Sequence, residues 1–112
     1  MTALVNEPLA ILQPDVAKYC LTQDFLRLVP LALKRGKYVV PHFLGAGPGQ
    51  VFSAHLAAGC GDQPLVEWDV NENPLHTDFF EEPLEIADGM LTLPDRPGIG
   101  WTPKLTDFAT TR

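Results

Sequence analysis

The first seventy residues alternate short apolar runs with longer amphipathic ones. The runs at 9–15, 37–42 and 64–69 are short and rich in aliphatic residues, which is typical of buried strands. Between them, residues 22–36 and 49–59 carry apolar positions at helical spacing, and each stretch ends in a glycine that can close a helix. The order strand, helix, strand, helix, strand predicts an α/β fold in which three parallel strands are joined by right-handed crossovers.

The pattern changes after residue 69. Residues 70–83 show no clear period and many turn residues, and we expect an irregular loop there. Within 84–94, an Asp-Gly pair separates two alternating runs and predicts a β-hairpin. The remaining residues to 112 are punctuated by glycine and proline, so we expect an irregular tail.

The composition narrows the class of protein. A chain of 112 residues that is 46% hydrophobic can bury one modest core. The net charge of −6 is uneven, because residues 62–112 hold eleven acidic and three basic residues. An acidic second half argues against a nucleic-acid partner, since phosphates require a basic face.

No targeting or spanning segment is visible. No apolar run approaches the roughly 20 residues that a membrane-spanning helix needs, and the first ten residues lack the basic start of a secretory signal. The two cysteines, Cys20 and Cys60, have no second cysteine near them at metal-ligand spacing. We therefore expect reduced thiols, no membrane partner and a cytoplasmic location.

Three polar residues stand at the ends of the three predicted strands. Asp15 follows the first strand, His42 ends the second and Glu67 lies near the end of the third. The carboxyl ends of neighbouring parallel strands meet at one rim, which is where α/β folds place their chemistry. A carboxylate beside an imidazole fixes its tautomer and makes it a candidate general base, and a protonated glutamic acid can donate to a developing oxyanion.

The glycine-rich stretch 45–50 offers a weaker alternative, a loop that cradles the phosphates of a nucleotide. Its glycines depart from the dinucleotide spacing, and Pro48 removes one backbone donor. A loop that lets a ligand or another backbone approach closely stays open. No metal site is predicted, because the acidic residues after Trp68 lack the spacing of a calcium loop.

Several stretches together resemble one known family. They are "ILQPDVAKY", "VVPHFLGAGPGQVFSAHLAAG", "LVEWDVNENPL" and "PLEIADGMLTLPDRPGIG". In this order and spacing, over residues 4–104, they are similar to the C-terminal part of the mandelate racemase/muconate lactonizing branch of the enolase superfamily. The resemblance implies the last three strands of a TIM-type (β/α)₇β barrel over residues 1–69. It also implies that residues 70–112 pack on the capping domain of a full-length enzyme.

The resemblance also implies chemistry. Asp15 and His42 would form a general-base dyad that takes the proton α to a carboxylate, and Glu67 would hydrogen-bond the substrate carboxylate. Members of this branch use Mg²⁺, and they dehydrate acid sugars or racemise their substrates. Their metal ligands and lysine base lie on earlier strands, so we expect an inactive fragment that binds no Mg²⁺ alone.

Two other functions remain open on the sequence. The chain could be a non-catalytic subunit that associates with itself or completes another chain through exposed strand edges. It could also be a small nucleotide-binding α/β protein that uses the glycine-rich stretch.

Overall fold

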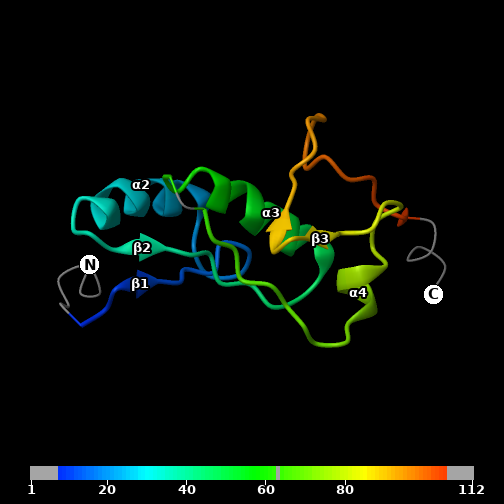
Figure 1. The fold of residues 1–112 in the computed structure, drawn as a ribbon, viewed down its shortest axis with the longest axis horizontal. Coiled ribbons are helices and arrows are strands. Elements are labelled where there is room, and N and C mark those ends of the chain that lie inside the picture. The colour runs from blue at the N-terminus through cyan, green and yellow to red at the C-terminus, as the bar shows by residue number, and fades with distance from the viewer. Residues whose placement is uncertain (1–7, 63, 106–112) are drawn as a thin grey trace.

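A short parallel sheet under a helix forms the N-terminal part of the computed structural model, which describes residues 8–62 and 64–105. Strand β1 (Ile11–Leu12) pairs in parallel with β2 (Tyr38–Val39), and Ile11 lies opposite Tyr38. Helix α2 (Thr22–Leu33) connects them and lies along the pair (Figure 1). The predicted strand, helix, strand order is confirmed for this unit.

The main core lies between α2 and one face of the sheet. Alternation along each strand sends one residue of each pair inward and the other outward. Leu12 and Val39 are buried, whereas Ile11 and Tyr38 are each 50% exposed. The opposite face of the pair is therefore uncovered at these positions. The buried cluster contains Leu12, Val16, Phe25, Val29, Ala32, Val39 and Cys60.

Helix α3 (Gly47–Ala58) follows the glycine-rich loop and ends at a cap residue, Gly59. The ring of Phe43, which is only 5% exposed, lies against this loop. A Cβ on Gly49 would be 2.1 Å from Phe43 Cζ, and one on Gly45 would be 3.0 Å away. Packing therefore explains Gly45 and Gly49, because only a residue without a side chain lets the backbone approach the Phe43 ring this closely.

The third predicted strand is not formed. Residues 64–70 are neither strand nor helix, so the described parallel sheet has two strands instead of three. A side chain bonds this segment where a neighbouring strand would otherwise do so: Gln50 Nε2 donates to the main-chain oxygen of Glu67 at 2.7 Å.

The C-terminal part contains one more helix than we predicted. Within the expected loop, Pro74–Thr77 forms α4, and the side chain of Asn73 caps it by accepting the Leu75 N–H at 3.1 Å. The predicted hairpin is confirmed: β3 (Ile86–Ala87) pairs antiparallel with β4 (Met90–Leu91).

The hairpin turn uses the expected residues. Asp88 and Gly89 have φ angles of 51° and 75°, as a tight turn of this kind requires. Beyond it, Phe80 bridges Pro103 in antiparallel fashion and lies 6.3 Å from the Trp101 ring. The end of the predicted tail, residues 106–112, lies outside the described residues.

Replacing Gly49 with alanine tests the contact between the loop and the Phe43 ring. Alanine favours a helix by about 1 kcal/mol over glycine, but overpacking a filled site costs about 1–3 kcal/mol. The difference between these two effects is about 0–2 kcal/mol, so we expect the free energy of unfolding of Gly49→Ala, measured in urea, to fall by up to about 2 kcal/mol. In a Phe43→Ala background the same substitution should no longer destabilise the chain, and an unchanged penalty there would refute the contact.

Candidate functional site

His42 and Glu67 form the centre of the candidate site. The imidazole Nδ1 lies 2.6 Å from Glu67 Oε2, and the Phe43 N–H donates to the same oxygen at 3.0 Å. The two side chains are 38% and 29% exposed, so the pair lies at the surface of the described chain and not in its core. The structure thus brings together two of the three residues predicted from the sequence.

The pairing decides which imidazole nitrogen can act. An ionised carboxylate only accepts hydrogen bonds, so a neutral His42 ring carries its proton on Nδ1. The lone pair is then on Nε2, the nitrogen that can take a proton from another molecule. Glu67 holds the ring in this tautomer, and the arrangement suits a general base.

Main-chain contacts set the position of this pair. The His42 N–H donates to the Pro14 carbonyl at 3.1 Å, which continues the register of the parallel pair beyond β2. On the other side, Gln50 holds the Glu67 carbonyl, as described above, and Gln50 is fully buried. The site therefore depends on the end of β1, the end of β2 and the first turn of α3.

The carboxylate of Asp15, which the resemblance pairs with His42, bonds within its own turn in the described chain. Its Oδ1 accepts the N–H groups of Ala17 at 3.0 Å and Lys18 at 2.9 Å, and its Oδ2 lies 3.6 Å from Lys18 Nζ. No hydrogen bond or ion pair joins Asp15 to His42 among the residues described. The reason is local: an aspartate that ends a strand can satisfy the N–H groups of its own following turn.

A second carboxylate, Asp69, fastens the loop after His42. It accepts the Asn71 N–H at 3.0 Å and the Asn71 amide at 2.7 Å. These bonds, the nearby His76 and the Gly45 N–H lower the pKa of Asp69. Asn73 reaches the same loop through its amide, which donates to the Gly45 carbonyl at 3.3 Å.

Neither a metal site nor a membrane span is present in the described chain. Within residues 8–62 and 64–105, no three His, Cys, Asp or Glu side chains come together in a group that could hold a metal ion. The donor set of this stretch therefore does not fit Mg²⁺. No helix in the same residues is long and apolar enough to cross a membrane. Burial raises the pKa of both cysteine thiols, most simply for Cys60, where it is the sole cause.

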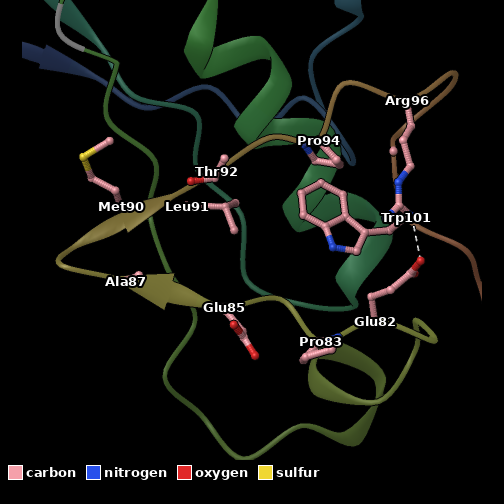
Figure 2. Close-up of a pocket in the computed structure, with 11 residues that line it drawn as sticks. Glu82, Pro83, Glu85, Ala87, Met90, Leu91, Thr92, Pro94, Arg96 and Trp101 are labelled. Carbon is pink, nitrogen blue, oxygen red and sulfur yellow. Dashed lines mark hydrogen bonds and ion pairs between the residues drawn. The ribbon is translucent and has the colours of Figure 1, made fainter.

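A separate cavity of about 270 Å³ lies between the hairpin and the tail. Figure 2 shows Trp101 and Pro94 facing it, with the hairpin residues Met90 and Leu91 on another side. Arg96 Nη1 donates to Glu82 Oε1 at 2.7 Å, and the Thr102 N–H donates to Glu82 Oε2 at 3.2 Å. The Arg96 bond, followed by the Thr102 bond, lowers the pKa of Glu82.

Sequence reasoning missed three residues that shape the site. Lys18 follows Asp15 by three positions, a spacing at which side chains on a turn can meet, and Phe43 directly follows His42. Gln50 lies in the first turn of α3, where it is fully buried and bonds the Glu67 carbonyl. None of these side chains belongs to a motif with a chemical signature.

Comparison with known proteins matches the family described as Enolase C-terminal domain-like over residues 1–107. The chain is 32% identical to arabinonate dehydratase of Saccharolobus solfataricus over 92 residues, which cover 82% of this chain and 24% of that protein. It is 34% identical to D-galactarolactone cycloisomerase of Agrobacterium fabrum over 99 residues, covering 80% and 26%. The chain thus spans about a quarter of the length of these curated relatives.

The fold has a counterpart among solved structures. The mandelate racemase/muconate lactonizing enzyme from Jannaschia sp. CCS1 superposes with a TM-score of 0.71 at 24% identity. The match covers 87% of this chain and 25% of that one. This likeness shows that the described chain has the α/β fold of a part of that solved structure.

The Glu82–Arg96 pair predicts an acid-dependent loss of stability. A folded-state pKa below the ordinary value, about 4.3 for glutamate, gives stability that is present above that pH and is lost as the pH falls. We measure the free energy of unfolding in urea between about pH 3 and 6. As the pH falls, this free energy should decrease less for Glu82→Gln than for the parent chain.

The Arg96→Gln background serves as the control for that measurement. In that background the main cause of the lowered pKa of Glu82 is gone. Adding Glu82→Gln should therefore change the pH dependence of the unfolding free energy much less. Equal effects in both backgrounds would show that Arg96 does not set the titration of Glu82.

Proposed function

The chain belongs to the Enolase C-terminal domain-like family, and from that premise we propose that it forms part of an enzyme that removes the proton α to the carboxylate of an acid sugar. The relatives named above include an arabinonate dehydratase and a galactarolactone cycloisomerase. Both names concern sugar-acid chemistry, and this supports the substrate class.

The observation that carries the proposal is the 2.6 Å contact between His42 and Glu67. Nε2 of the imidazole takes the α-proton, while Glu67 holds the protonated Nδ1 and stabilises the imidazolium that forms. This assigns to Glu67 the orienting role that the family resemblance gave to Asp15. Both donors contact Oε2 of Glu67, and we propose that groups other than this oxygen bind the substrate carboxylate.

The metal-dependent part of the reaction falls outside this chain in our proposal. Membership of the superfamily implies Mg²⁺ in full-length members, and a bound cation stabilises negative charge that develops on a substrate oxygen. Because no three His, Cys, Asp or Glu side chains come together within residues 8–62 and 64–105, the metal ligands would come from other residues. The 112-residue chain by itself is then expected to be inactive.

Complementation tests this assignment. The part of S. solfataricus arabinonate dehydratase that precedes the matched region is co-expressed with this chain, and exchange of the α-proton of arabinonate with deuterium is measured. We expect exchange in the mixture and none with either piece. His42→Asn should reduce it by about 100-fold or more, the usual contribution of a general base.

The matched control replaces another histidine. His55 lies on α3 and its Nε2 contacts the Ile99 carbonyl at 3.0 Å, away from Glu67. His55→Asn should retain exchange wherever the complex forms. Exchange that survives His42→Asn, or robust turnover by the lone chain, would refute the proposal.

A second candidate function, a complementing subunit without catalytic groups of its own, is favoured by the uncovered sheet face. Ile11 and Tyr38 are register partners, and both are half exposed. An exposed pair of strands with an apolar face is a site for association with another chain. In this function His42 would contribute nothing to the activity of the complex.

The uncovered face can be tested by introducing a charge. Ile11→Lys should abolish association with the complementing piece, seen by size-exclusion chromatography with light scattering, because the lysine would be buried there. Leu26→Lys is the matched control, since Leu26 is 58% exposed on α2. Equal loss in both variants would show that the sheet face is not the interface.

A further inference from the structure

The cavity between the hairpin and the tail is built around the Trp101 indole. This ring lies 6.3 Å from that of Phe80, which is only 1% exposed. Gly100, with a φ of 83°, brings the tail backbone against Pro94, since a Cβ at Gly100 would lie 2.4 Å from Pro94 Cγ. Phe80 and Pro94 therefore hold the segment that carries the indole, and the ring forms one wall of the cavity.

The hairpin forms another wall, to which Met90 and Leu91 contribute. Figure 2 shows the nitrogen edge of the Trp101 indole turned toward Glu85 and Pro83, which line the same cavity. No hydrogen bond joins the indole N–H to an acceptor within residues 8–62 and 64–105. It is therefore a donor that a bound molecule can use.

The charged groups of the lining leave one carboxylate without a partner. Arg96 and Glu82 neutralise each other through their 2.7 Å bond. Glu85 makes no hydrogen bond or ion pair with any other residue that the structure describes. The lining thus carries two negative charges and one positive charge, and the excess negative charge lies on Glu85. Such a cavity favours a cation.

The size of the cavity narrows the class of ligand. Its volume of about 270 Å³ lies below the range of about 300–1,000 Å³ that is usual for drug-sized ligands. An alkyl ammonium suits it, because the alkyl stem can lie against Leu91 and Trp101 while Glu85 attracts the charge. The indole N–H needs an acceptor such as a carbonyl, and a lysine residue of a polypeptide offers both groups.

We propose that this cavity binds the side chain of a lysine from a polypeptide segment outside these 112 residues. Polypeptide beyond the matched region exists in the curated relatives, of whose length this chain covers about a quarter. Residues 62–112 hold eleven acidic and three basic residues, so the whole second half attracts a basic segment. The site is independent of His42 and of the proposed reaction.

Binding is tested by titrating the full ¹⁵N-labelled chain with N-acetyl-lysine methylamide at constant ionic strength. The chain has two tryptophans, so ¹H–¹⁵N correlation spectra contain two indole N–H signals, and Trp101→Phe identifies that of Trp101. We expect the Trp101 signal to move in a saturable way at millimolar ligand. The Trp68 signal should stay in place, because Trp68 lines a different cavity. No saturable movement of the Trp101 signal, or equal movement of both signals, overturns the proposal.

Two further probes separate charge from apolar contact, and a polypeptide from a free amine. N-acetyl-norleucine methylamide keeps the alkyl stem without the ammonium, and it should bind about 3-fold more weakly or worse. n-Butylamine keeps the ammonium without the carbonyl groups, and it should also bind more weakly than the lysine derivative. Equal affinity for the norleucine derivative would show that the charge plays no part, and equal affinity for n-butylamine would show a site for free amines. Either result overturns the proposed occupant.

Glu85→Gln removes the unpartnered charge and keeps the shape of the side chain. It should weaken binding of the lysine derivative by about 3- to 5-fold, as expected for one exposed ion pair, and leave binding of the norleucine derivative unchanged. Because Glu85 is exposed immediately before β3, the substitution should leave the fold intact.

Glu81→Gln is the matched control, since Glu81 is exposed and does not line the cavity. It should leave the affinity for the lysine derivative unchanged. Equal weakening by both variants would assign the effect to the net charge of the chain. That result, or no weakening by Glu85→Gln, overturns the proposal.

Discussion

The Glu67 carboxylate is the group on which the arrangement of the site depends. One of its oxygens receives both the His42 imidazole and the Phe43 N–H, and its main-chain carbonyl is held by the buried Gln50. Residues 64–70 do not form a strand, so no backbone hydrogen bonds of a sheet hold them. The contacts of Glu67 hold this segment instead. A buried amide that donates to a backbone carbonyl is costly to remove, because the carbonyl loses its hydrogen-bond donor.

The Phe43 ring links that polar arrangement to the packing of the chain. Its N–H belongs to the site, while its ring fills the space over Gly45 and Gly49 at the start of α3. The glycine-rich stretch is therefore accounted for by an aromatic contact, and a phosphate ligand is not needed to explain it. The same ring lies under the Lys18 ammonium, so apolar packing and charge both act on the residue next to His42.

Periodicity predicted the elements well wherever local forces decide them. Both long helices and the Asp88–Gly89 hairpin formed at the expected places, because helical spacing, a closing glycine and turn residues act within a few positions. The third strand failed because a strand needs a neighbour with free backbone groups, which no local pattern reports. Helix α4 was missed because a single turn capped by Asn73 leaves too short a pattern.

The site was predictable in its residues and not in its pairing. The predicted strand ends placed Asp15, His42 and Glu67 at one rim, and the structure brings His42 and Glu67 together. The choice of partner for His42 depends on competition between side chains. Asp15 has two N–H groups of its own turn within reach, and those local bonds require no ordering of distant chain segments. Glu67 instead lies within reach of two donors that follow β2, the His42 imidazole and the Phe43 N–H. A carboxylate that satisfies its own turn is less available to an imidazole, and this competition explains why His42 contacts Glu67 where the family resemblance implied Asp15.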